Sequence, residues 1–135
     1  MMNRRSITTF CVIVAALFLL VIGVIHGIVN VSGLRRAIER GDIPARFRIP
    51  VLSNAGYSGA ALSLLGLLVL FVLPGLRAGS RQAARVAISI GIFTAIVGAV
   101  SYIWVPTKPA VLIFLFFGAL LAAPLLIWRG QFSNM

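Results

Sequence analysis

Among the polar side chains within the apolar stretches of this chain, seven are the candidates for chemistry. An imidazole can accept or pass on a proton near neutral pH, while tyrosine hydroxyls and an asparagine amide can hydrogen-bond a polar ligand. Polar residues in such surroundings usually face a bundle interior or a cavity, and they are candidates for function. The residues of this candidate polar pocket are His26, Asn30, Asn54, Tyr57, Ser58, Ser101 and Tyr102.

The same side chains also have a purely structural interpretation. Asn, Ser, Tyr and His side chains that cross between membrane helices hold a bundle together at about 0.6 kcal/mol each. A lone histidine such as His26 is more often a hydrogen-bonded interior residue than a catalytic one. Both interpretations stay open at this point.

Four long apolar stretches must position these polar groups. None of them contains Asp, Glu, Lys or Arg: Ile7–Val31, Val51–Leu73, Val86–Val105 and Ala110–Trp128. A bilayer core of about 30 Å needs about 20 apolar residues per helix, and the runs lack the alternation of barrel strands. We therefore predict an all-α membrane protein, with residues 1–135 forming one domain as an antiparallel four-transmembrane-helix bundle.

The alternating direction of four spans would bring the polar groups to a similar depth. His26 and Asn30 come late in the first stretch, Tyr57 comes early in the second, and Tyr102 comes late in the third. At 1.5 Å per residue these groups fall within a few turns of one another. The pocket would open on the side of the membrane away from the termini.

The connection from Ser32 to Pro50 is the most basic part of the chain. Leu34, Ala37 and Ile38 recur at helical spacing before Gly41, which predicts a short interfacial amphipathic helix between spans 1 and 2. Its arginines are expected to contact anionic lipid headgroups or a partner. They are Arg35, Arg36, Arg40, Arg46 and Arg48.

Two further connections are expected, at Pro74–Arg85 and at Pro106–Pro109. In the first of them, arginines at positions 77, 81 and 85 would share one helical face. Trp104 and Trp128 are placed as interfacial aromatic residues. Small residues spaced by four in every span, such as Gly23 and Gly27, predict close helix packing.

The formal net charge of +10 comes from 12 basic and 2 acidic residues. Short loops cannot build the basic groove and aromatic platform of a nucleic-acid site, so no nucleic-acid partner is expected. Counting the basic residues on the two sides of four spans returns six on each, and the positive-inside rule then gives no orientation. We favour cytoplasmic termini, with insertion in both orientations as the alternative.

The spans lack the groups that most membrane chemistry needs. They hold no carboxylate, and the chain has a single His and a single Cys, so no metal site, axial haem pair or thiol pair can form within it. A Ser-His-Asp arrangement lacks an acid near His26, because Glu39 and Asp42 lie in the connection. We expect no cofactor and no catalytic residues.

The span pattern, with His26 late in the first span and Gly41-Asp42-Ile43-Pro44 before the second, resembles small uncharacterised four-transmembrane-helix bacterial inner-membrane proteins. That resemblance implies a multi-pass protein of the bacterial inner membrane. The resemblance to small multidrug resistance transporters stops at size and span count, because the glutamate of their first span is absent. The Arg-x-x-x-Asn-x-x-Glu signature of four-helix glutathione-type transferases is also absent.

These observations favour an integral membrane protein of accessory, scaffold or lipid-interacting type. Its expected partners are the lipid bilayer, with anionic lipids foremost, and a second copy or another membrane protein. The alternative is a small transporter or channel, as a single chain or a dimer, with a polar intramembrane site near His26 and Tyr57. A membrane enzyme acting on a lipid-like substrate is the third hypothesis.

Overall fold

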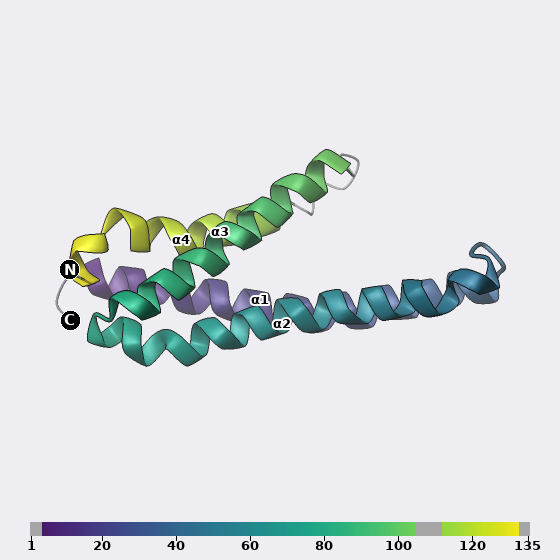
Figure 1. The fold of residues 1–135 in the computed structure, drawn as a ribbon, viewed down its shortest axis with the longest axis horizontal. Coiled ribbons are helices and arrows are strands. Elements are labelled where there is room, and N and C mark those ends of the chain that lie inside the picture. Colours follow the sequence, from purple (N-terminus) through teal and green to yellow (C-terminus); the bar gives the residue numbers. More distant parts are fainter. Residues whose placement is uncertain (1–3, 105–111, 133–135) are drawn as a thin grey trace. The chain divides into compact units, whose positions relative to one another are not determined.

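The computed structural model of the chain describes residues 4–104 and 112–132. Over these residues the chain is all-helical, without strands, which confirms the predicted helical class. The elements, drawn in Figure 1, are α1 (Arg4–Glu39), η1 (Ala45–Phe47), α2 (Arg48–Ala78), α3 (Arg81–Trp104), α4 (Leu112–Ile127) and η3 (Arg129–Phe132).

Three of the helical segments are long and apolar enough to cross a membrane, namely Ser6–Glu39, Ala45–Ala78 and Arg81–Ile103. They are consistent with a membrane protein. Helix α4 has 16 residues, about 24 Å at 1.5 Å per residue, which is less than a hydrocarbon core of about 30 Å. The predicted fourth span began earlier, at Ala110, and that part lies outside the described residues.

Helix α1 is longer than the first predicted span, and it contains the segment expected to be a separate interfacial helix. It runs unbroken over 36 residues to Glu39, so the prediction of a distinct amphipathic helix is wrong. Neither Ser32 nor Gly33 interrupts the helix, and the first glycine with positive φ among the described residues is Gly41 (φ +83°). The arginines at 35 and 36 are therefore part of α1.

A Schellman motif ends α1 at Gly41. The N–H of Asp42 donates to the carbonyl of Ala37 at 2.9 Å, and the N–H of Gly41 donates to the carbonyl of Ile38 at 3.0 Å. These two bonds satisfy carbonyls that the helix end would leave unpaired. Helix α2 then starts at Arg48, earlier than the predicted Val51, because Pro50 is tolerated in a first helical turn.

The connection between α2 and α3 is much shorter than the predicted Pro74–Arg85. Pro74 lies inside α2, and the actual stop is a second Schellman motif at Gly79 (φ +85°), where the N–H of Ser80 donates to the Gly75 carbonyl at 2.9 Å. The Oγ of Ser80 accepts from the N–H of Ala83 at 3.4 Å, so Ser80 both completes the motif that ends α2 and caps α3.

This short connection corrects the grouping of the three arginines at 77, 81 and 85. Arg77 lies at the end of α2, while Arg81 and Arg85 lie one turn apart at the start of α3. The three cannot share one helical face, because Gly79 and Ser80 separate two helices. The other predicted connection, Pro106–Pro109, lies outside the described residues, as does Val105.

Contacts divide the chain into two compact units. The hairpin unit comprises residues 18–67, which hold the C-terminal part of α1 and the N-terminal part of α2. The four-helix unit comprises residues 1–17 and 68–135, which hold the other ends of these helices together with α3 and α4. The same two long helices thus contribute to both units.

In the hairpin unit α1 and α2 lie side by side (Figure 1) in close contact through small residues. A Cβ added at Gly23 would lie 2.5 Å from the backbone nitrogen of Ser63, and one added at Gly59 would lie 2.6 Å from the Cα of Gly27. At these contacts residue numbers rise along α1 as they fall along α2. The predicted small-residue packing at Gly23 and Gly27 is confirmed.

The four-helix unit uses the same device between α3 and α4. A Cβ added at Gly91 would lie 2.9 Å from the nitrogen of Ala122, and one at Gly98 would lie 2.5 Å from the nitrogen of Leu115. Thr94 is almost fully buried and its hydroxyl donates to the Ile90 carbonyl of its own helix at 2.8 Å. The buried apolar residues of this unit are Val12, Ala15, Ala16, Val69, Leu76, Ala83, Ala84, Ala87, Ile90, Leu121, Ala122, Leu125 and Phe132.

Candidate functional site

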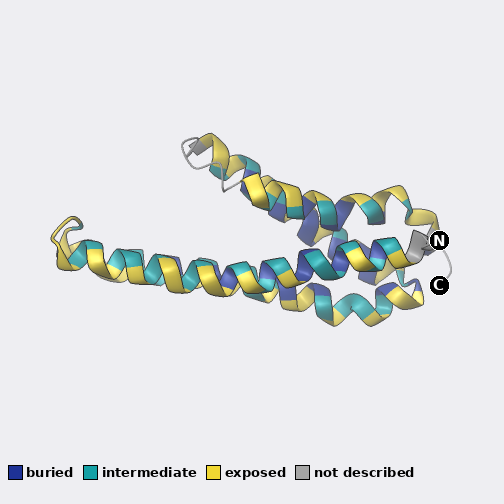
Figure 2. Ribbon diagram, turned by 180° about the vertical axis from the view of Figure 1, so that it is seen from behind, coloured by how far each residue is buried: buried dark blue, intermediate teal, exposed yellow. Residues whose placement is uncertain are grey.

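The end of the hairpin unit carries a concentration of exposed arginines, which we call the basic tip. Figure 2 shows this end as largely exposed, from the last turn of α1 through the loop to the start of α2. Its members are the arginines that the sequence singled out: Arg35, Arg36, Arg40, Arg46 and Arg48, all exposed.

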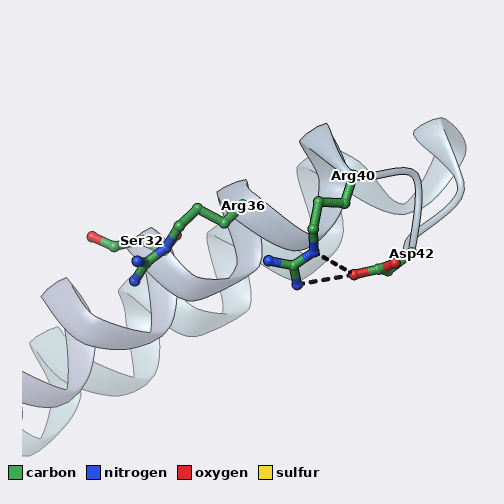
Figure 3. Close-up of polar contacts among 4 residues, drawn as sticks. All are labelled: Ser32, Arg36, Arg40 and Asp42. Atoms are coloured by element: carbon green, nitrogen blue, oxygen red, sulfur yellow. Dashed lines mark hydrogen bonds and ion pairs between the residues drawn. The ribbon is translucent and has the colours of Figure 1, made fainter.

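Few of the described interactions at the basic tip neutralise charge (Figure 3). The Nε and an Nη atom of Arg40 both lie 2.9 Å from Oδ2 of Asp42, and both side chains are more than half exposed. The Nε of Arg36 donates to the Ser32 carbonyl at 3.4 Å. An exposed ion pair contributes roughly 0–1 kcal/mol, so the tip is positively charged and only lightly held by its own contacts.

Arg46 makes a different kind of contact. Its guanidinium carbon lies 4.9 Å from the centroid of the Phe47 ring, within range of a cation–π interaction. The 3₁₀ turn of η1 places both residues in the loop that joins α1 to α2. This pairing presents an aromatic ring and a cation together, a combination that suits the interfacial region of a membrane.

A hollow of about 480 Å³ lies between the two helices at the basic tip. Arg35 and Glu39 border it from α1 and Arg48 borders it from α2, with Ile38 and Leu52 as apolar lining. The hollow therefore has basic groups from both helices and one carboxylate. Its volume and its guanidinium groups suit a phosphate-sized anion.

The polar residues of the predicted pocket are partly paired within their own helices. Nε2 of His26 lies 2.8 Å from Nδ2 of Asn30, one turn further along α1, and the pair is half-buried. The hydroxyl of Ser58 donates to the Ala55 carbonyl of α2 at 2.9 Å. Each of these bonds joins residues of one helix, so they do not by themselves connect α1 to α2.

Helical geometry places the members of the predicted pocket on different sides of the α1–α2 contact. Counting about 100° per residue from the contacting glycines, Ser58 lies on the same flank as His26 and Asn30 and at a similar depth. Asn54 and Tyr57 lie further round α2, away from α1, and Tyr57 is 74% exposed.

Ser101 and Tyr102 lie near the end of α3 and belong to the four-helix unit, whereas the other members belong to the hairpin unit. The structure thus brings His26 and Asn30 into contact and places Ser58 on their flank. A pocket that joins all seven residues stays a prediction.

The opposite flank of the same contact is a shallow apolar groove of about 410 Å³. On the α2 side a small residue leaves it open, since no heavy atom lies within 4 Å of a Cβ added at Gly56. Val24, Ile28 and Val31 form its α1 side, and Ala60 lies on its α2 side. No charged side chain is among the residues that line the groove, and apart from Ser63 their side chains are apolar, so the lining suits apolar chains.

The sequence alone did not point to Arg129, which the structure brings next to Arg81 and Arg85 around a hollow in the four-helix unit. The sequence held one signal for a basic site in this part of the chain, because no acidic residue follows Asp42. These three arginines come together because η3 lies against the start of α3. Nothing in the sequence indicated that contact.

Among residues 4–104 and 112–132, no three His, Cys, Asp or Glu side chains gather into a group that could hold a metal ion. Comparison of the chain with protein-family models, with curated proteins and with solved structures finds no match. Function must therefore be argued from the physical chemistry of these sites.

Proposed function

We propose that the chain is a four-span antiparallel membrane protein of the bacterial inner membrane whose basic tip binds anionic lipid headgroups, in an accessory or scaffold role. The observation that carries this proposal is the exposed cluster of five arginines at the end of two long apolar helices. Only two carboxylates accompany them, Glu39 and Asp42.

Distances along the helices support this role. The charge-free parts of α1 and α2, residues 6–34 and 49–76, are each more than 40 Å long at about 1.5 Å per residue, whereas the hydrocarbon core is about 30 Å thick. Each helix is therefore long enough to cross this core and still place its arginines in the headgroup layer. There, each arginine gains about 1 kcal/mol from a negatively charged surface.

The test is the lipid that accompanies the purified chain. The full chain is reconstituted in vesicles of equal phosphatidylglycerol and phosphatidylcholine, extracted in mild detergent, and its retained lipids are measured by mass spectrometry. Replacing the five tip arginines by Gln should lower the ratio of anionic to zwitterionic lipid severalfold. A variant with the same five positions changed to Lys keeps the charge and should retain most of the anionic lipid.

Two results would overturn the proposal. An unchanged lipid ratio in the Gln variant would show that the tip does not select anionic headgroups. Failure of the unaltered chain to enter vesicles would remove the membrane location itself.

A further inference from the structure

The four-helix unit contains a second basic hollow, of about 390 Å³. Arg81 and Arg85 border it from the first turns of α3, and Arg129 borders it from η3. Its remaining lining is mostly apolar, with Ala84, Ile88, Leu125 and Phe132 among the residues. The hollow thus combines three guanidinium groups with a hydrocarbon floor.

Tertiary contacts hold the two sides of this hollow together. Phe132 is 4% exposed, so its side chain anchors η3 in the core of the unit. The Nε of Arg81 donates to the Phe132 carbonyl at 3.2 Å, which ties the start of α3 to the same segment. Arg129, three residues before Phe132, is thereby held beside Arg81 and Arg85 rather than left on a loose tail.

The charges around the hollow favour an anion. The two acidic side chains of the chain, Glu39 and Asp42, belong to the hairpin unit, so none is part of this unit. The N-terminal end of a helix carries a partial positive charge, so an anion is favoured there and two cations at the start of α3 are unfavourable for the helix. Helix stability therefore does not explain Arg81 and Arg85, whereas an anion would interact favourably with three guanidinium groups and with the helix end.

The face of α3 that carries these arginines becomes apolar further along. At helical spacing, Arg81 and Arg85 are followed by Ile88, Ile92 and Ile96, and the last two are 45% and 56% exposed. Along one face, two cations thus precede three isoleucines. A glycerophospholipid has the same order, with a charged phosphate followed by acyl chains.

We propose that this hollow binds the phosphodiester headgroup of an anionic glycerophospholipid, with Arg81, Arg85 and Arg129 on the phosphate and an acyl chain along Ile88, Ile92 and Ile96. This site is distinct in residues from the basic tip, and it rests on the proposed function only for the membrane location. Because Arg81 also bonds Phe132, Arg85 and Arg129 are the residues whose replacement tests binding most directly.

The experiment measures binding of a short-chain phosphatidylglycerol to the detergent-solubilised full chain by native mass spectrometry. Arg85→Gln and Arg129→Gln should each weaken binding about tenfold or more, since each removes a charge-assisted bond. Arg77→Gln is the matched control, because Arg77 is an exposed arginine of the same unit that does not border the hollow. It should change binding less than about twofold.

Two further measurements distinguish binding of the whole lipid from binding of its phosphate alone. Ile92→Asn should weaken phosphatidylglycerol binding, while free glycerol phosphate should compete only weakly because it lacks the acyl chain. Equal competition by glycerol phosphate would assign the site to a soluble phosphate and overturn the lipid proposal. Equal losses in the Arg77 and Arg85 variants, or no loss in either, would also overturn it. Retained vesicle insertion with normal tip selectivity would show that the proposed function stands even then.

Discussion

Two glycines in the hairpin unit differ in what surrounds them, and this difference decides how the α1–α2 pair can be altered. A Cβ at Gly59 would meet backbone atoms of Gly23 and Gly27 at 2.6–2.7 Å, whereas a Cβ at Gly56 meets nothing within 4 Å. Backbone atoms cannot rotate away as a side chain can. At the residue scale, the close approach of α1 and α2 therefore requires glycine at position 59.

Gly59→Ala should consequently force the two helices apart. We expect the free energy of unfolding to fall by about 1–3 kcal/mol, the usual range for overpacking a tight contact. Gly56→Ala is the matched control, and it should leave stability unchanged or raise it by up to about 1 kcal/mol, because alanine favours helix. Denaturant titration in detergent, followed by circular dichroism, measures both. Equal stabilities for the two variants would contradict the close approach at Gly59.

A hydrogen bond between the helices gives a second residue-scale prediction. The hydroxyl of Ser63 donates to the Leu20 carbonyl of α1 at 3.2 Å. Ser63→Ala should lower stability by about 0.6 kcal/mol, the average for such bonds between membrane helices. Ser58→Ala should have a smaller effect, because its bond to Ala55 stays within α2. The same denaturant titration compares the two variants. A larger loss of stability in Ser58→Ala than in Ser63→Ala would contradict the prediction.

At the scale of elements, two glycines with positive φ decide where the long helices end. Gly41 and Gly79 have φ of +83° and +85°, and each allows the paired backbone bonds that close its helix. Side chains with a Cβ rarely adopt this conformation. The lengths of α1 and α2 thus depend on these two positions more than on the prolines or charges near them.

Substitution of either helix-ending glycine should therefore destabilise the chain. Gly79→Ala and Gly41→Ala should each lower the free energy of unfolding by roughly 1 kcal/mol, with Gly79→Asn less affected than Gly79→Ala because asparagine tolerates this conformation. Gly33→Ala is the control, since Gly33 lies within α1 with open space around it, and it should be neutral or stabilising. Destabilisation by Gly33→Ala equal to that by Gly79→Ala would contradict the explanation.

These helix ends also show what could be read from the sequence. The charge-free apolar runs predicted four helices, because the length of an apolar run can be read directly from the sequence and compared with the thickness of the hydrocarbon core. The prediction placed connections from Ser32 and from Pro74, whereas the helices continue to Glu39 and Ala78 and end at glycines with positive φ. The small-residue contacts were predictable from spacing. The grouping of Arg129 with Arg81 was not, because it depends on how η3 folds back onto α3.

At the scale of the whole molecule, charge is divided unevenly between the two compact units. The hairpin unit holds five arginines and both acids, a formal charge of +3, while the four-helix unit holds seven basic residues and no acid, a formal charge of +7. The positive-inside rule, however, counts Lys and Arg near span ends and gives acids little weight. On the proposed four-span topology the two membrane sides carry six basic residues each.

A tie of this kind makes orientation sensitive to small changes. Replacing Arg35 and Arg36 by Gln leaves four basic residues on their side, so a larger fraction of chains should insert with cytoplasmic termini. Replacing Arg77 and Arg81 by Gln leaves four on the other side and should shift the fraction the opposite way. Reporters active only in the cytoplasm or only outside it, fused to the C-terminus, measure the two fractions. An equal reporter ratio in both double variants would show that something other than charge balance orients the chain.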